Sequence, residues 1–203
     1  MTFQEHYFDE VGKVASLLKT NQVIDTIIEK LIEARASGKR IFFIGSGGGA
    51  GHASHATCDF RKLAGFEAYC PTDNVSELTA RINDEGWDSS IAECLKAMRL
   101  SAGEIIFVFS VGGGDAEKNI SANLVQAIKY GKSIGAEVVG VVGRDGGFAG
   151  RNGNCVVINV EDKDLITPIV EAYQAVVWHL IVSDPRIQVQ KAKWESTEQI
   201  ITK

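Results

Sequence analysis

The sequence predicts an α/β fold in which a parallel sheet is covered by helices on both faces. Short apolar runs rich in β-branched residues recur along the chain, and helix-like segments separate them. Continuous apolar runs, unlike alternating ones, are typical of strands that are buried on both faces. The five predicted strands cover residues 40–44, 67–70, 104–110, 137–142 and 155–160.

Helices are expected between these strands, at residues 51–64, 89–100 and 116–134. Before the first strand, the apolar spacing of residues 11–36 predicts two helices that are separated at Thr20 and Asn21. After the last strand, residues 164–182 are apolar on all sides, which predicts a helix buried against the sheet or against another subunit. Pro185 ends this helix, and the polar residues after it give no clear signal.

Length and composition predict one domain. The chain has 203 residues with 45% hydrophobic content, enough for a full core. We expect N-terminal helices at residues 1–38, an α/β core at 39–184 and a C-terminal tail at 185–203. A formal charge of -5 disfavours nucleic acid and anionic membranes as partners.

Four scattered cysteines without a CxxC spacing predict neither a disulfide framework nor a thiolate zinc site. Their pattern fits a reducing cytoplasm. The N-terminus is acidic and polar, and no apolar run is long enough for a membrane span, so we expect a cytoplasmic protein without a signal peptide.

Two glycine-rich loops follow predicted strands, GSGGGAG at residues 45–51 and SVGGGD at residues 110–115. Ligands of open parallel sheets bind outside the carboxyl ends of the strands, and backbone N–H groups of such loops can hold an anion. The two loops are therefore predicted to outline one pocket. Their spacing is not that of a dinucleotide-binding GxGxxG loop, and no P-loop lysine follows, so both of those functions are disfavoured.

Four titratable residues could form a metal site. His55 and Asp59 are four apart on one helix face, and Glu171 and His179 are eight apart near one face of an apolar helix. A carboxylate on a buried helix needs a cation or a proton. Two imidazoles and two carboxylates suit a divalent ion, with zinc favoured and nickel or iron as alternatives. The alternative for the first pair is an incidental contact, and for His179 a core histidine beside Trp178.

Five motifs occur in a fixed order: GSGGGAGHASHATCDF, INDEGWD, FVFSVGGGDAEKN, VVGVVGRDGGFAG and EAYQAVVWH. Together they resemble the sugar isomerase (SIS) domain, in its phosphoheptose isomerase branch, from about residue 41 to residue 182. This resemblance implies a three-layer αβα sandwich with a five-stranded parallel sheet. It also implies a homotetramer with active sites between subunits. The implied reaction converts a ketose phosphate, most specifically sedoheptulose 7-phosphate, to a heptose 7-phosphate for lipopolysaccharide or capsule.

The resemblance also implies roles for individual residues. The metal would be held by His55, Asp59, Glu171 and His179. Asp59 and His179 would act as base and acid, moving a proton between C1 and C2 through an enediol. The implied substrate-binding residues are Ser46, Gly47, Gly48, Gly49, Asp84, Ser110, Gly112, Gly113, Gly114, Asp115 and Lys118.

The chain departs from the family pattern in both loops. Ser46 and Gly49 stand where the family has asparagine and serine, and Ser110 alone remains of the serines that grip phosphate in the second loop. Asp115 would compete with a phosphate for backbone N–H groups. The phosphate would then move toward residues 47–49 and Lys118, or the ligand would be an unphosphorylated or nucleotide-linked sugar. A further alternative is a non-catalytic SIS protein that binds a sugar phosphate or docks a protein, of the replication-initiation-factor type.

Overall fold

The computed structural model describes residues 1–191. Five strands form one sheet in the order β2-β1-β3-β4-β5, and every neighbouring pair is parallel. The strands are β1 (Ile41–Gly45), β2 (Ala68–Tyr69), β3 (Ile105–Ser110), β4 (Glu137–Gly143) and β5 (Asn154–Ile158). The predicted fold class is thereby confirmed.

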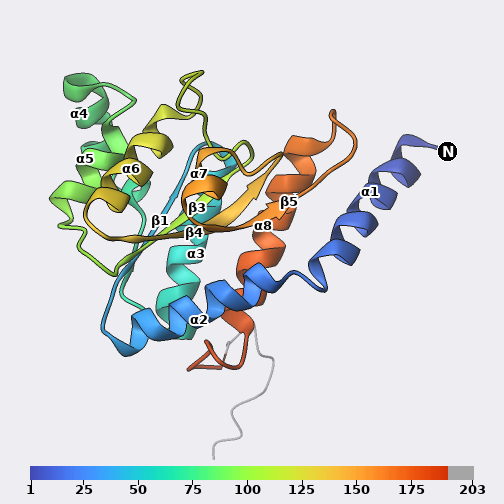
Figure 1. The fold of residues 1–203 in the computed structure, drawn as a ribbon, viewed down its shortest axis with the longest axis horizontal. Helices are drawn as coiled ribbons and strands as arrows, with labels where there is room; N and C mark the ends of the chain where they lie inside the picture. The colour runs from blue at the N-terminus through green and yellow to red at the C-terminus, as the bar shows by residue number, and fades with distance from the viewer. Residues whose placement is uncertain (192–203) are drawn as a thin grey trace, which may run out of the picture.

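Helices cover both faces of this sheet (Figure 1). On one face lie α2 (Gln22–Ala36), α3 (Gly48–Ala64) and α8 (Ile166–Ser183), whose apolar residues share one core cluster. On the other face lie α5 (Ser90–Ala97), α6 (Ala122–Ser133) and α7 (Gly147–Asn152). The remaining elements are α1 (Phe3–Leu18), which projects away from the sheet (Figure 1), the 3-10 turn η1 (Pro71–Asp73) and α4 (Val75–Glu85).

The alternation of side chains along each strand explains why continuous apolar runs are needed here. In β1, Ile41 and Phe43 enter the cluster with α3 and α8, while Phe42 and Ile44 enter the cluster on the opposite face. Because successive strand residues point to opposite faces, a sheet with two covered faces requires an apolar residue at every position.

Helix α8 is long and apolar enough to cross a membrane by length and composition. In this fold it packs on α3 and β4. Its buried residues include Val177, Trp178 and Ile181, which belong to the core. The prediction of an all-round apolar helix buried against the sheet is confirmed, with the helix beginning two residues later than expected.

Some element boundaries differ from those predicted. The helix expected from residue 116 begins only at Ala122, because Asp115 and Ile120 pair through two backbone hydrogen bonds of 2.9 and 3.0 Å and enclose a turn. Helix α1 begins at Phe3 instead of residue 11, where a capping box of Thr2 and Glu5 starts it. Helices α4 and α7 were not predicted: α4 buries no residue, and α7 has only 6 residues.

The first part of the predicted tail is packed against the body. Ile187 is buried, and the backbone N–H groups of Val189 and Gln190 donate to the carbonyl of Leu63. The rest of the tail, from residue 192, lies outside the described residues.

Candidate active site

The loop after β1 brings the start of α3 against both β3 and α8. A Cβ atom on Gly49 would lie 2.4 Å from the carbonyl oxygen of Phe109 in β3, and one on Gly48 would lie 2.6 Å from the carboxylate of Glu171 in α8. At position 49 only glycine allows this close approach, because the contact is with backbone, whereas the Glu171 carboxylate opposite Gly48 is the end of a flexible side chain that can shift. The glycines of the first loop therefore position α3 in addition to exposing backbone N–H groups.

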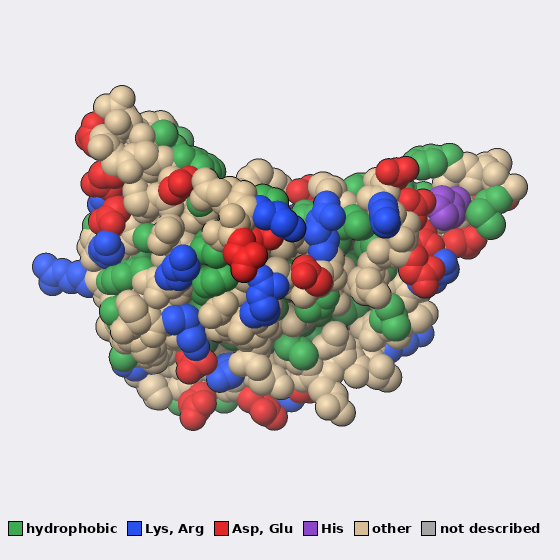
Figure 2. Space-filling view, turned by 45° about the horizontal axis from the view of Figure 1, so that its top comes forward, with side chains coloured by type: hydrophobic (Ala, Val, Ile, Leu, Met, Phe, Trp, Pro, Cys, Tyr) green, Lys and Arg blue, Asp and Glu red, His purple; other side chains and the backbone are tan. Residues whose placement is uncertain are grey.

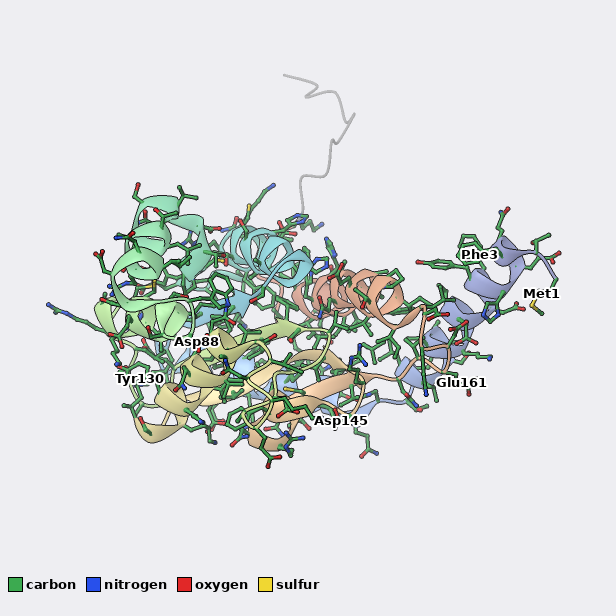
Figure 3. The ribbon with its side chains drawn as sticks, turned by 90° about the horizontal axis from the view of Figure 1, so that it is seen from above. Met1, Phe3, Asp88, Tyr130, Asp145 and Glu161 are labelled. Carbon is green, nitrogen blue, oxygen red and sulfur yellow. The ribbon has the colours of Figure 1, made fainter. Side chains whose placement is uncertain are left out.

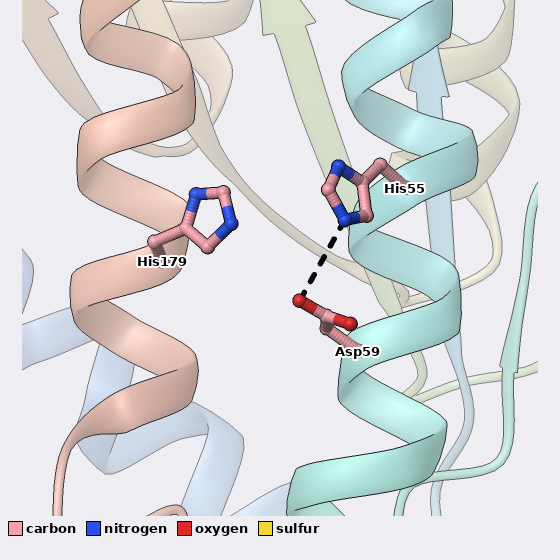
Figure 4. A group of neighbouring side chains, drawn as sticks. All are labelled: His55, Asp59 and His179. Carbon is pink, nitrogen blue, oxygen red and sulfur yellow. Dashed lines mark ion pairs between the residues drawn. The ribbon is translucent and has the colours of Figure 1, made fainter. Parts of the chain in front are cut away.

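Helices α3 and α8 run side by side, and three titratable side chains meet between them (Figure 4). His55 and Asp59 come from α3, and His179 comes from α8. One ligand atom from each lies within 4.8 Å of the other two. The Nε2 atom of His55 lies 3.9 Å from Oδ2 of Asp59. We call these three residues the seam group.

The seam group is open on one side and buried on the other. The side chain of His55 is 59% exposed and that of Asp59 only 5%. The Oδ2 atom of Asp59 is buried without a hydrogen-bond partner among the described residues. An unsatisfied buried carboxylate oxygen is rare in native proteins and indicates a missing cation, proton donor or water.

The ring of His179 has a defined orientation. Its Nδ1 atom lies 2.8 Å from the carbonyl oxygen of Ala175, so Nδ1–H donates there and Nε2 keeps its lone pair. The ring stacks on the indole of Trp178 at 3.5 Å between centroids, and the ring of His55 meets that indole edge-on at 4.8 Å. These contacts fix the imidazole in the tautomer that can bind a metal ion or accept a proton at Nε2.

The donor set of the seam group fits a divalent metal ion. Two imidazoles and one carboxylate form a common set for catalytic zinc, which leaves a further position for a ligand. Ligand atoms around tetrahedral zinc lie about 3.4 Å apart, so the side chains must close by roughly 1 Å from their present positions. The unpartnered Oδ2 of Asp59 is the independent observation that favours a cation.

Glu171 lies outside the seam group within the described chain, so the predicted four-ligand set stays a prediction. Its carboxylate lies against Gly48 at the start of α3. Eight helical residues span about 12 Å along the axis, so a shared helix face does not bring Glu171 and His179 to one ion. Glu171 instead faces His52, whose pKa is lowered by burial against the opposing effect of the Glu171 charge.

The second glycine loop is held closed by its own residues. The N–H of Gly113 donates to Oγ of Ser110, and those of Glu117 and Lys118 donate to Oδ1 of Asp115. These backbone hydrogen bonds, that of Lys118 first, lower the pKa of Asp115. Asp115 therefore occupies the N–H groups of Glu117 and Lys118, which follow the loop, and not those of Gly112 to Gly114, for which the sequence predicts competition.

Ser46 and Asp84 are placed very differently. Ser46 accepts a hydrogen bond from Nδ2 of Asn123, a buried residue of α6, so the first loop is joined to the start of α6. Asp84 is exposed on α4, which packs on α5 and lies far from α8 in Figure 1. Within one chain, Asp84 therefore does not reach the seam group.

Sequence reasoning missed two residues around these loops. Asn123 is fully buried and its Oδ1 atom has no partner among the described residues. No pattern in the sequence distinguishes it from a surface asparagine at the start of a helix. His52 is part of the HASH motif but was assigned no role, and it lies beside Glu171 at the open end of α3.

The fold is a layered α/β fold with loops at the carboxyl ends of its strands, the edge at which open parallel sheets bind ligands, and a histidine–aspartate group lies between two of its helices. Residues 6–143 match the family model of the SIS domain. The chain belongs to the SIS-domain family.

Relatives and solved structures agree with this family. A lincomycin biosynthesis protein from Streptomyces lincolnensis is 34% identical over 145 residues, which are 68% of this chain but only 52% of that protein. A probable phosphoheptose isomerase from Thermoplasma acidophilum is 27% identical over 180 residues, covering 86% of this chain and 93% of that one. The structure of a phosphoheptose isomerase from Neisseria gonorrhoeae superposes with a TM-score of 0.74 at 24% identity, over 89% of this chain and 97% of that one.

Proposed function

We propose that this protein is a metal-assisted aldose–ketose isomerase of a sugar phosphate, most specifically one that converts sedoheptulose 7-phosphate to a heptose 7-phosphate. The observation that carries the proposal is the meeting of His55, Asp59 and His179 between α3 and α8. Membership of the SIS-domain family and the phosphoheptose isomerases among its relatives support the substrate class.

Asp59 is suited to be the base. Its carboxylate is buried and has an oxygen without a partner, so it can take a proton from C1 of the ketose and return it to C2 of the enediol. His179 is suited to move the second proton, because Nε2 can accept it from the C1 hydroxyl and deliver it to the C2 oxygen. Each group ends the cycle in its starting protonation state.

His55 and Asp59 would hold the metal during the reaction, because Nε2 of His179 cannot bind the ion while it carries the transferred proton. Before that transfer, His179 would complete the three-residue ligand set. When bound, a divalent ion such as zinc polarises a substrate carbonyl and lowers the cost of enediol formation. Glu171 is better placed beside His52 to contact substrate hydroxyls than to bind this ion.

We propose further that the protein is a homotetramer in which active sites lie between subunits. Large apolar side chains are exposed on α1 and on α8, among them Phe3, Phe8, Val176 and Leu180. On α8 they flank His179, so a second copy placed there would cover the open side of the seam group. Light scattering of the purified protein measures this; a monomer at micromolar concentration would contradict it.

The activity is tested by incubating zinc-loaded protein with a panel of ketose phosphates that includes sedoheptulose 7-phosphate. The proposal predicts the aldose product and exchange of one substrate hydrogen with solvent. His55→Ala should lose metal and activity, while His6→Ala, which alters a histidine on α1, should lose neither. Absence of turnover and of hydrogen exchange with every ketose would refute the isomerase.

A second candidate is a non-catalytic SIS protein that binds a sugar phosphate or a protein. The occupation of backbone donors by Asp115 favours it, because a phosphate-gripping loop would leave those donors free. Metal analysis separates the two candidates, since a binding protein has no need of zinc in the seam group.

A further inference from the structure

A pocket lies outside the carboxyl ends of β3 and β4, next to the second glycine loop. It has a volume of about 390 Å³ and is lined by residues of the β3 loop and by the GRDGG segment that follows β4. Figure 3 shows Asp145, one of its residues, on the side of the sheet away from α3 and α8. We call it the β3–β4 pocket.

Positive side chains converge on the β3–β4 pocket. Lys118 comes from the β3 loop, Arg144 from the end of β4 and Arg151 from α7. Figure 2 shows Lys and Arg side chains interspersed with Asp and Glu across the middle of one face of the molecule. The pocket also contains Asp115 and Asp145, so its formal charge is positive by one unit.

Both acidic residues are already engaged. Asp115 accepts two backbone hydrogen bonds and lies 3.6 Å from Nζ of Lys118. Asp145 accepts a hydrogen bond from the backbone of Gly147 and lies 3.8 Å from Nη1 of Arg151. Because each carboxylate is satisfied by the loops around it, neither neutralises the remaining cation.

That remaining cation is Arg144. Its guanidinium forms no hydrogen bond or ion pair with any residue in the described range 1–191, and its side chain is exposed. Its backbone has a φ of 53°, the left-handed region in which a non-glycine residue is strained. A strained arginine without a partner, at the carboxyl end of a central strand, is not explained by the stability of the fold.

We propose that the β3–β4 pocket binds a phosphoryl group of a small molecule, with Arg144 as its principal contact and with Lys118 and Arg151 beside it. A guanidinium forms paired hydrogen bonds with phosphate oxygens, and the volume is enough for a phosphorylated sugar. The glycine loops are less suitable for the same group, because Glu171 lies over Gly48 and Oγ of Ser110 already accepts the N–H of Gly113 in the second loop.

This assignment deepens the proposed function, since it names residues that could hold the phosphate of the substrate, but the pocket itself does not depend on isomerase activity. The phosphoryl group can belong to the sugar phosphate or to a separate phosphorylated effector. The chemistry of recognition is the same in both cases, and only the experiment distinguishes them.

Calorimetric titration with inorganic phosphate at low ionic strength tests the pocket directly. Arg144→Gln should weaken binding about ten- to a hundredfold, the effect of losing charged hydrogen bonds. Arg99→Gln is the matched control, because Arg99 is also an exposed arginine with a φ of 56° but lies before β3, at the opposite end of the sheet. No phosphate binding by the wild type, or equal binding by the two variants, would overturn the proposal.

Replacement by glycine gives a second, independent readout. Arg144→Gly and Arg99→Gly should both raise Tm, because glycine accepts the left-handed backbone without strain. Only Arg144→Gly should lose phosphate binding. A loss of binding in both variants would mean that backbone rigidity is responsible, which also overturns the role of the guanidinium.

Kinetics with a ketose phosphate then identify the source of the phosphoryl group. A higher KM for Arg144→Gln with unchanged kcat assigns the pocket to the phosphate of the substrate. An unchanged KM, together with weaker binding of inorganic phosphate, assigns it to a separate phosphorylated effector. If no ketose is turned over by the wild type, the proposed function fails, while the titration still decides whether the pocket binds phosphate.

Discussion

The seam group and the second glycine loop differ in whether their polar side-chain atoms already have hydrogen-bond partners. In the seam group, the Oδ2 atom of Asp59 has no hydrogen-bond partner within the described chain and lies 3.9 Å from Nε2 of His55, and Nε2 of His179 keeps its lone pair. In the loop, Ser110 and Asp115 are fully engaged with backbone N–H groups. The seam group therefore has atoms free for a ligand, whereas the polar side chains of the loop expected to hold phosphate are bonded to nearby backbone. Since different elements carry the two regions, one can change without the other.

The largest effect is expected in the seam group. Asp59→Asn and His179→Asn should each lower kcat about 10²–10⁴-fold, because each removes a proton-transfer group. Steady-state kinetics and thermal unfolding measure both properties. In metal-free protein, Asp59→Asn should keep or raise Tm, because it removes a buried carboxylate oxygen that has no hydrogen-bond partner.

Asp164→Asn, an exposed aspartate before α8, is the control for these variants and should leave kcat unchanged. If Asp59→Asn or His179→Asn kept the wild-type kcat, the replaced group would have no role in the reaction, and the contrast with the second glycine loop would have no functional meaning.

Zinc should stabilise the protein through the seam group alone. At a free concentration 100 times Kd, binding adds about 2.7 kcal/mol, which raises Tm by about 5–10 °C for a chain of this size. Chelation should reverse the shift. His55→Ala should abolish it, whereas Glu171→Gln should retain it because Glu171 lies against Gly48. Loss of the shift in Glu171→Gln would show that Glu171 binds the ion after all.

The first glycine loop should be sensitive to added side-chain volume at Gly49. Gly49→Ala places a Cβ atom 2.4 Å from the Phe109 carbonyl and should cost about 2 kcal/mol or more of unfolding free energy. Gly51→Ala, on the same helix, meets nothing within 4 Å and should stabilise by up to about 1 kcal/mol. Urea unfolding of the two variants measures the difference, and equal effects would contradict the close approach of α3 to β3.

The smallest effect concerns the charge of Asp115. Its folded-state pKa is lowered, first by the backbone N–H of Lys118. Its stabilising contribution is therefore present above the unfolded value, near 3.9, and is lost as the pH falls through the lower folded value. The Tm difference between wild type and Asp115→Asn should shrink below about pH 4.

At neutral pH, Asp115→Asn should also bind inorganic phosphate severalfold more tightly, because a repelling charge is gone while the side-chain oxygen can still accept the N–H groups of Glu117 and Lys118. Glu117→Gln removes a nearby charge but keeps the backbone N–H that donates to Asp115, so it should not change the acid dependence of Tm. If Asp115→Asn had the same acid dependence of Tm and the same phosphate affinity as the wild type, the second glycine loop would not depend on this carboxylate.

The sheet could be predicted from the sequence because a strand covered on both faces leaves a continuous apolar run, as in residues 105–110. Family membership could be predicted because the loop motifs and the GRDGG segment occur in a fixed order, and the match to the SIS domain confirms it. The start of α6 could not be predicted, since Asp115 draws the chain into a turn through side-chain contacts that helical propensity does not encode.

The candidate site was predicted in part. Periodicity gives the angle around a helix, and it correctly placed His55 and Asp59 on the face that meets His179. It does not give the offset along a neighbouring helix, which decides that Glu171 meets Gly48 while His179 meets His55. The proposed role of Arg144 could not be predicted from the sequence, because its left-handed backbone and its lack of a side-chain partner among the described residues are properties of the fold.

The stacking of Trp178 beneath His179 makes the site optically visible. The indole is fully buried and in contact with the imidazole, so a positive charge acquired by that ring lies over the π-face at cation–π distance. Fluorescence of Trp178 should therefore change whenever His179 gains a proton or a metal ion. Trp178 is thus an intrinsic fluorescent probe of the site. Replacement of the exposed Trp87 by phenylalanine would remove one source of background emission without changing the core.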